Sequence, residues 1–270
     1  MLRWAGLLVV GFIAALLVLE RTRPLRRAVE PGARRRLRNA AIGALTACEL
    51  AAVERPVIRR VMVWTAERRW GLLRRMALPR WVETLAAVVL LDYTLYLWHI
   101  LLHRVPLLWR FHLAHHVDRD LDASTALRFH VGEFLASVPW RAAQVALIGV
   151  TPRALELWQQ LTALEVLFHH SNVRLPLVAE RALGLLVVTP RLHGIHHSTE
   201  RSERDSNFSS GLTVWDRLHG TWRDDVPQQR ITIGVSPYGR SADLSVKRTL
   251  LLPFATGEQR PKPSLPRSEP

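Results

Sequence analysis

The stretch "WHILLHRVPLLWRFHLAHH" (Trp98–His116) carries histidines at regular offsets inside an apolar, tryptophan-rich sequence. It contains one HxxxH pattern and one HxxHH pattern, and a second HxxHH follows near residue 195. On a helix, offsets of three and four residues return to the same face, so each pattern aims its rings at one point. The histidines of the three patterns are His99, His103, His112, His115, His116, His193, His196 and His197. They predict a metal site, because neutral imidazole is a common ligand for iron, zinc and copper.

Eight imidazoles exceed what one four-coordinate zinc ion uses, so the patterns predict two metal ions. Further candidate ligands are His130 in "RFHVGE" and one of the pair His169 and His170 in "FHHSN". A site with about ten imidazoles and few carboxylates differs from the Glu-rich di-iron centres of soluble helix bundles.

The segment "WVETLAAVVLLDYTLYLW" (Trp81–Trp98) is apolar with aromatic ends and predicts a membrane-spanning helix. It contains Asp92, which lies two helical turns before His99 and therefore shares its face. One interpretation is that this carboxylate orients the His99 ring. The alternative is a carboxylate that accepts a hydrogen bond from a neighbouring hydroxyl or amide.

The first apolar run, Trp4–Leu19, is close to the length that a bilayer crossing requires. A signal peptide is the alternative, but no small-x-small cleavage site follows and the run ends in an arginine-rich segment. We therefore expect a retained span. With only Arg3 before it, the positive-inside rule places the N-terminus outside and the loop Arg21–Arg38 in the cytoplasm.

The next apolar segment, Asn39–Val53, is short and carries Glu49, which makes it a weak span. The basic, amphipathic stretch "ERPVIRRVMVWTAERRWGLLRRMALPR" that follows is typical of an interfacial helix. If Asn39–Val53 does span, these arginines lie outside and break the positive-inside rule. The sequence leaves both alternatives open.

Two further apolar runs, Phe134–Val150 and Arg153–Phe168, are joined by "TPR" and predict a helical hairpin of membrane length. The hairpin returns His169 and His170 to the side of the membrane where the first HxxHH pattern lies. The following segment, Leu177–Val188, is short enough to lie on the surface.

Composition limits the class of protein. The single cysteine excludes an intramolecular disulfide and a CxxC metal site. The 37 Lys and Arg against 23 Asp and Glu give a formal charge of +14, and the arginines cluster beside apolar runs. This distribution favours contact with anionic lipid over nucleic acid. The chain has no GxGxxG after a strand and no CxxCH, so we expect electrons from a separate ferredoxin-like or cytochrome-like protein, which a basic face could dock. The alternative is that the arginines only set topology and contact lipid.

The motifs HILLH, HLAHH and HGIHH, in this order around a membrane hairpin, resemble those of the fatty acid hydroxylase and sterol desaturase superfamily. The resemblance extends to "LWRFHLAHHVDRDLDASTALRFHVGE", "HSNVRLP", "TPRLHGIHHS", "DSNF" and "WDRLHGTW", and it covers roughly Trp70 to Trp222. Two positions depart from the pattern. Ser209 stands where glycine is common, and His219 stands where an aromatic residue is usual, so we expect His219 to be a surface or packing residue.

The resemblance implies an integral membrane di-iron oxygenase that hydroxylates or desaturates an unactivated C–H bond of a lipid, fatty acyl or sterol-like substrate, with O2 as co-substrate. It implies that the eight patterned histidines bind two Fe ions. It adds His170 as the better candidate of its pair, and His130 more weakly. Acidic and amide residues near the patterns are candidates for orienting ligand rings, although solvation or helix capping is the commoner role for any one of them. They are Asp118, Asp120, Asp122, Glu133, Asp205, Asn207 and Asp216.

We therefore expect an all-α integral membrane protein with about four to five spans or re-entrant helices and a cytoplasmic helical cap that carries the histidines. The expected location is the bacterial inner membrane. Residues 1–80 would form a membrane anchor with basic interfacial helices, residues 81–225 a fatty acid hydroxylase-like catalytic domain, and residues 226–270 an extension with a disordered Pro-rich tail.

Two other classes of protein compete with this hypothesis. A membrane divalent-metal transporter or metal-binding protein would place its histidines along a path across the spans, whereas these histidines group outside the apolar segments. A zinc-dependent membrane hydrolase would require a general-base Glu, as in HExxH, and the chain has no such motif.

Overall fold

The computed structural model describes residues 2–236, 238 and 244–255, with side chains from residue 9 onward. These residues form an all-helical fold, as expected. The described residues contain isolated β-bridges but no strand. The Pro-rich tail that the sequence predicts to be disordered lies outside the described residues from position 256 on. The α-helices are α1 (Leu2–Thr22), α2 (Gly32–Glu49), α3 (Arg55–Glu67), α4 (Leu72–Arg75), α5 (Arg80–Arg104), α6 (Pro106–His116), α7 (Val131–Ile148), α8 (Pro152–His170), α9 (Leu177–Gly184), α10 (Pro190–His196), α11 (Arg201–Arg204), α12 (Val214–Leu218) and α13 (Val246–Leu251). A π-helical turn, η1 (Leu50–Glu54), joins α2 to α3, and short 3-10 turns lie at η2 (Ala123–Leu127), η3 (Gln228–Arg230) and η5 (Leu252–Phe254).

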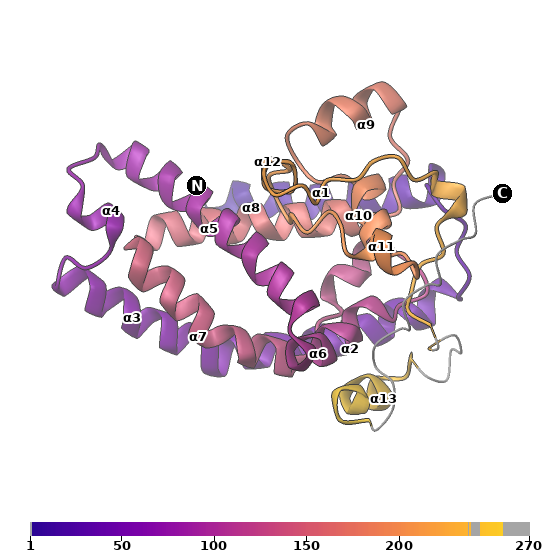
Figure 1. Cartoon of the computed structure of the whole chain (residues 1–270), viewed down its shortest axis with the longest axis horizontal. Helices are drawn as coiled ribbons and strands as arrows, with labels where there is room; N and C mark the ends of the chain where they lie inside the picture. The colour runs from indigo at the N-terminus through magenta and orange to yellow at the C-terminus, as the bar shows by residue number, and fades with distance from the viewer. Residues whose placement is uncertain (1, 237, 239–243, 256–270) are drawn as a thin grey trace.

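The long helices form an elongated bundle, and the short helices α9 to α12 gather over one end of it (Figure 1). A core of Ile58, Leu73, Leu91, Val145 and Trp158 joins α3, α4, α5, α7 and α8. We call the end where α5 and α8 finish, beside α6 and α10, the histidine end.

The hairpin predicted between residues 134 and 168 is confirmed as α7 and α8. Gly149 ends α7 with φ +79°, a left-handed conformation that glycine adopts without strain. The Thr151 side chain then accepts a hydrogen bond from the Ala154 amide, and Pro152 begins α8. Gly71 packs so closely against Gly149 that a Cβ on Gly71 would collide with the Gly149 backbone, and a Cβ on Gly149 would collide with the Arg74 side chain. This contact ties α4 to the tip of the hairpin, far from the histidine end.

The segment that the sequence splits into a weak span and an interfacial helix is one continuous helical run from Gly32 to Glu67. The π-helical turn η1 lies inside it, where Glu54 is buried and its carboxylate lies 3.6 Å from Arg141 of α7. Residues 39–53 therefore form no separate element. Arg74 of α4 donates to the Gly149 carbonyl and therefore lies at the tip of the hairpin, away from the histidine end.

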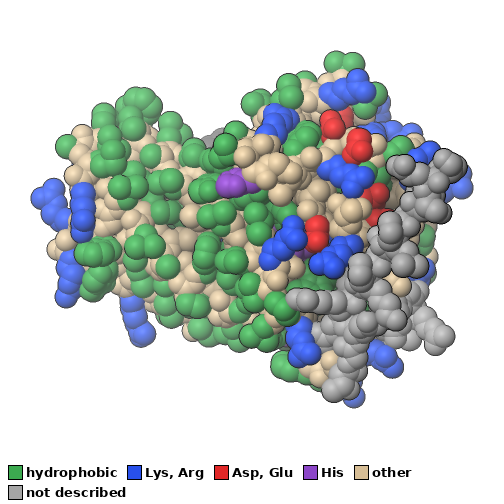
Figure 2. Space-filling view, viewed as in Figure 1, with side chains coloured by type: hydrophobic (Ala, Val, Ile, Leu, Met, Phe, Trp, Pro, Cys, Tyr) green, Lys and Arg blue, Asp and Glu red, His purple; other side chains and the backbone are tan. Residues whose placement is uncertain are grey.

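Helix α5 is the one helix in the described part of the chain that is long and apolar enough to cross a membrane by length and composition. Figure 2 shows hydrophobic side chains over much of the left and middle of the molecule, with Lys and Arg side chains at the left tip and over the right part. This apolar middle with basic ends is typical of a chain that sits in a bilayer.

Candidate metal centre

Three helices, α5, α6 and α10, bring the patterned histidines together at the histidine end. His99 and His103 lie one turn apart on α5, which ends at Arg104 before Pro106 begins α6. Helix α6 carries the first HxxHH pattern in its second half. Helix α10 carries the second, and the side chain of Thr189 caps it by accepting a hydrogen bond from the Leu192 amide.

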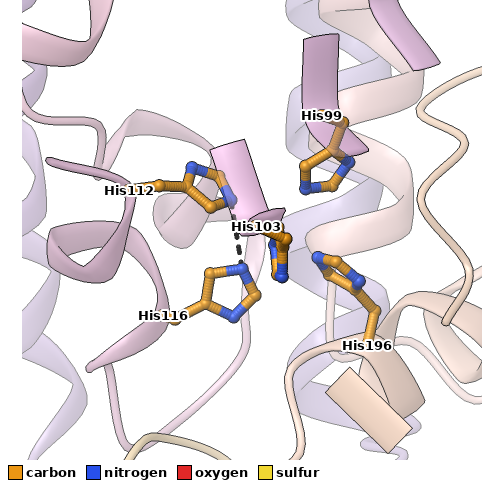
Figure 3. A group of neighbouring side chains, drawn as sticks. All are labelled: His99, His103, His112, His116 and His196. Carbon is orange, nitrogen blue, oxygen red and sulfur yellow. Dashed lines mark hydrogen bonds between the residues drawn. The ribbon is translucent and has the colours of Figure 1, made fainter. Parts of the chain in front are cut away.

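The rings sort into two groups in which the possible ligand nitrogens lie within 4.8 Å of one another. Figure 3 shows the rings of the first group turned toward a common centre. The first group is His99, His103, His112, His116 and His196. The second group is His115, His170, His193 and His197. Each HxxHH pattern therefore supplies both groups.

The two groups abut one another. The ring centroids of His116 and His197 are 4.4 Å apart, and those of His115 and His197 are 4.7 Å apart. All nine residues are buried except His103, whose side chain is nevertheless only 1% exposed. The arrangement suits two neighbouring cations in one water-poor site.

The donor chemistry fits metal ions. Nε2 of His170 lies 3.0 Å from Nε2 of both His115 and His193, and no carboxylate stands between these rings. Nε2 of His99, Nε2 of His196 and both ring nitrogens of His103 are buried without a hydrogen-bond partner among the described residues. Buried nitrogen lone pairs that face one another are costly unless a cation or shared protons satisfy them.

Hydrogen bonds from outside the groups orient the rings. Nδ1 of His99 donates to the Phe208 carbonyl at 2.7 Å, and Nδ1 of His196 donates to the Ser206 carbonyl at 2.8 Å. Nδ1 of His170 donates to the Val166 carbonyl at 2.8 Å. In each case the hydrogen stays on Nδ1, which leaves the Nε2 lone pair free for a metal.

Burial keeps the imidazoles neutral. Removal from water lowers the pKa of His115, His116, His193, His196 and His197 well below the usual value of 6.5, and neighbouring histidines lower it further. Neutral imidazole is the form that binds a metal, so the site needs no proton loss near pH 7 to receive one.

Among the predicted orienting residues, Glu133 contacts a ring directly: its carboxylate accepts a hydrogen bond from Nδ1 of His112 at 3.1 Å. Asp216 contacts no ring but bonds to the loop that holds one. Its oxygens accept hydrogen bonds from the Phe208 and Ser209 amides, which fixes the loop whose carbonyl holds His99. Asp205 lies 3.7 Å from Nδ1 of His103, beyond hydrogen-bond length.

The remaining predicted orienting residues contact no ring. Asp118 is buried against Arg35 at 3.0 Å, and Asp122 caps η2. Asp120 accepts hydrogen bonds from the amides of Val29 and Glu30. The Asn207 amide nitrogen donates to the carbonyls of Leu192 and Arg223.

The interpretation that Asp92 orients His99 is wrong, and the alternative holds. Asp92 Oδ2 accepts hydrogen bonds from the Trp215 indole at 2.7 Å and from the Leu212 amide at 3.1 Å. His99 instead donates to a backbone carbonyl. Two helical turns put Asp92 on the correct face but leave it too far along the axis to reach that ring.

Three further histidines lie outside both groups. Both nitrogens of His130 bond to backbone: Nδ1 accepts from the Gly132 amide, which caps α7, and Nε2 donates to the Leu250 carbonyl. His169 is buried with its ring 4.1 Å from that of His193. His219 is exposed and stacks on Tyr93 and Tyr96, as expected of a packing residue.

Two arginines that the sequence does not single out support the centre. Arg128 is fully buried, and its guanidinium donates to Ala114 of α6, Asn39 of α2 and Thr249 of α13. Arg26 donates to the Pro190 carbonyl at the start of α10, and its guanidinium lies against Gly194, where a Cβ would collide with it. Sequence spacing does not predict these contacts, because each arginine lies far along the chain from the residues that it contacts.

A family model described as fatty acid hydroxylase matches residues 84–221, the part of the chain that contains all nine grouped histidines. The chain belongs to the fatty acid hydroxylase family. Membership agrees with the resemblance carried by the motifs HILLH, HLAHH and HGIHH. No solved structure matches the chain significantly.

This member of the fatty acid hydroxylase family is similar to several proteins whose names describe lipid or sterol enzymes. The ornithine lipid hydroxylase OlsE of Rhizobium tropici is 31% identical over 58% of the chain and 47% of its own length. The human alkylglycerol monooxygenase is 28% identical over 54% of the chain and 31% of its own length. The rat cholesterol 25-hydroxylase is 28% identical over 56% of the chain and 50% of its own length. The chain thus spans half or less of the length of these relatives.

Proposed function

We propose that this protein is a membrane-bound di-iron monooxygenase that hydroxylates an unactivated C–H bond of a lipid, fatty acyl or sterol-like substrate, using O2 and external electrons. The observation that carries the proposal is the pair of abutting, buried groups of imidazoles without a carboxylate between them. The relatives are named as hydroxylases or monooxygenases, which favours hydroxylation over desaturation.

In the proposed site, His99, His103, His112, His116 and His196 hold one iron, and His115, His170, His193 and His197 hold the other. Bound iron would supply the activation of O2 and the oxidising power for C–H cleavage. Hydrogen bonds at Nδ1 hold the metal-facing lone pairs of five rings in place: those of His99, His112, His115, His170 and His196. Burial excludes bulk water, which protects a reactive site from side reactions.

The membrane placement is also a proposal. Helix α5 and the α7–α8 hairpin would cross or enter the bilayer with α1, giving about four to five spans or re-entrant helices. The histidine end would face the cytoplasm, in the bacterial inner membrane. Residues 1–80 would serve as anchor, residues 81–225 as catalytic domain and residues 226–270 as extension.

The proposed electron donor is a separate ferredoxin-like or cytochrome-like protein. The net charge of +14 supports an acidic partner, since opposite charge accelerates docking. A metal transporter is the weaker candidate, because nine imidazoles in two closed groups make a resident site and not a path across the bundle.

Incorporation of labelled oxygen tests the function. The iron-loaded protein in detergent is incubated with a bacterial lipid extract, a reductant and 18O2, and the lipids are analysed by mass spectrometry. We expect lipids with one 18O atom, absent without iron and in His196→Ala. Lipids that only lose two hydrogens would replace hydroxylation with desaturation, and unchanged lipids from a fully loaded protein would contradict the proposal.

A further inference from the structure

A cavity lies beside the metal centre. It has a volume of about 670 Å³ and lies between α9, the start of α10 and the segment 222–227. Leu192, which precedes the grouped His193, lines its wall next to Thr189. The cavity therefore adjoins α10, and none of the grouped histidines lines it.

The cavity contains an unsatisfied buried charge. Glu180 of α9 lines it and is only 3% exposed, and neither of its carboxylate oxygens has a hydrogen-bond partner among the described residues. The buried guanidinium of Arg26 lies close enough to attract this charge, but it donates no hydrogen bond to it. A buried carboxylate without a hydrogen bond is destabilising unless a ligand supplies a donor. Its chemistry calls for an ammonium group.

The same cavity is lined by both kinds of charge: the carboxylates Asp224 and Asp225 stand on the segment 222–227, and the arginines are Arg181, Arg191 and Arg217. Nε of Arg191 is buried without a hydrogen-bond partner in the described part of the chain. Arg217 is held in position, since its guanidinium donates to the carbonyls of Gly184 and Leu185 at 3.0 Å and lies 4.2 Å over the Trp222 ring. Guanidinium groups bind phosphate or carboxylate, so the cavity suits a ligand with both an ammonium and an acidic group.

Apolar side chains surround the cavity. Helix α9 stands at the edge of the molecule in Figure 1. On it and just beyond it, Val178 is 84% exposed, Leu185 61% and Leu186 67%, and Leu177 and Leu185 also line the cavity. An exposed apolar set next to a charged cavity is the arrangement by which interfacial helices contact lipid.

We propose that this cavity binds the zwitterionic headgroup of an amine-bearing membrane lipid, with the ammonium group on Glu180 and the acidic group on Arg191 and Arg217. The apolar side chains of α9 contact the lipid's acyl chains. This binding requires no iron and no turnover, so its test is independent of the proposed oxygenase activity.

The test is thermal unfolding of the iron-free protein in detergent, with and without phosphatidylethanolamine, together with native mass spectrometry of bound lipid. Phosphatidylcholine, whose ammonium cannot donate hydrogen bonds, and phosphatidylglycerol, which has no amine, serve as comparison lipids. Soluble phosphoethanolamine separates headgroup from lipid binding. The variants are Glu180→Gln, Gly184→Leu, which fills the cavity without changing its charge, and the control Glu67→Gln at an exposed carboxylate of α3.

We expect phosphatidylethanolamine to raise the unfolding temperature of the wild type and Glu67→Gln, and to bind Glu180→Gln about tenfold more weakly, as the loss of one charged hydrogen bond predicts. Lipid-free Glu180→Gln should unfold close to the wild-type temperature, because the lower cost of burying a neutral amide offsets the lost attraction to Arg26. If Glu180→Gln does not fold, Gly184→Leu provides the test: phosphatidylethanolamine should no longer raise the unfolding temperature of this variant.

Equal stabilisation of the wild type and Glu180→Gln would overturn the proposal. Equal binding of the three lipids would overturn it too, and an equal effect of soluble phosphoethanolamine would overturn the lipid assignment.

Discussion

The carboxylate of Glu133, at the start of α7, accepts a hydrogen bond of 3.1 Å from Nδ1 of His112 on α6. This contact ties the hairpin to the first histidine group and presents Nε2 of His112 to the metal side. We predict that Glu133→Gln lowers iron affinity by about 10- to 100-fold, the usual effect of removing such a partner. Iron titration of the metal-free protein measures it.

The control for that substitution is Glu156→Gln, which removes an exposed carboxylate at the distant start of α8. Its iron affinity should equal that of the wild type. Wild-type affinity in Glu133→Gln would show that the His112 ring is held without its carboxylate partner.

Gly194 lies between His193 and His196 of the second HxxHH pattern. This position requires glycine, because the Arg26 guanidinium occupies the space that a side chain would fill. We predict that Gly194→Ala displaces Arg26 from the Pro190 carbonyl and the Gln228 side chain and lowers the free energy of unfolding by about 1–3 kcal/mol. Chemical unfolding in detergent measures the change.

Gly184→Ala is the matched control, since a Cβ there makes an ordinary contact of 3.4 Å with Leu192. It should be neutral or slightly stabilising in a helix. When Arg26 is already replaced by Ala, the further substitution Gly194→Ala should lower the free energy of unfolding only slightly. If the two substitutions instead lower it additively, the two residues act separately.

Arg128 joins α6, α2 and α13 through three hydrogen bonds made by one buried guanidinium. We predict that Arg128→Lys lowers the free energy of unfolding by about 3 kcal/mol, because an ammonium group cannot reproduce the planar geometry and leaves buried acceptors unpaired. Arg110→Lys, on the exposed side of α6, should have no effect. Equal unfolding curves for the two variants would refute the role given to Arg128.

Asparagine substitutions at His130 and His170 distinguish a histidine that caps a helix from one that binds metal. His130→Asn should retain the iron content of the wild type, because asparagine can cap α7 in place of the imidazole. His170→Asn should reduce the iron content, since its Nε2 lies 3.0 Å from two rings of the second group. Iron loss in His130→Asn would restore His130 as a ligand.

The sequence predicts the features that local spacing determines. The i, i+3 and i+4 offsets identify eight of the nine grouped histidines, and "TPR" identifies the turn between α7 and α8. It does not predict how α6 and α10 divide their histidines between two groups. That division depends on how two helices, far apart in sequence, face each other.

Long-range polar contacts account for most of what the sequence misses. His99 and His196 bond to backbone carbonyls of Phe208 and Ser206, and a carbonyl carries no residue signature. Helical phase alone suggests that Asp92 could reach His99, whereas its partner Trp215 lies 123 positions away. The short apolar segment around Glu49 gave no sign that it continues into α3 as one helix.

Metal content tests the central claim most directly. Elemental analysis of the detergent-purified protein, handled without oxygen and supplied with iron, should give about two irons per chain. The content should fall in both His116→Ala, from the first group, and His193→Ala, from the second, while both variants remain folded. No bound iron in the wild type, or a single zinc ion unaffected by either substitution, would contradict the two-iron centre.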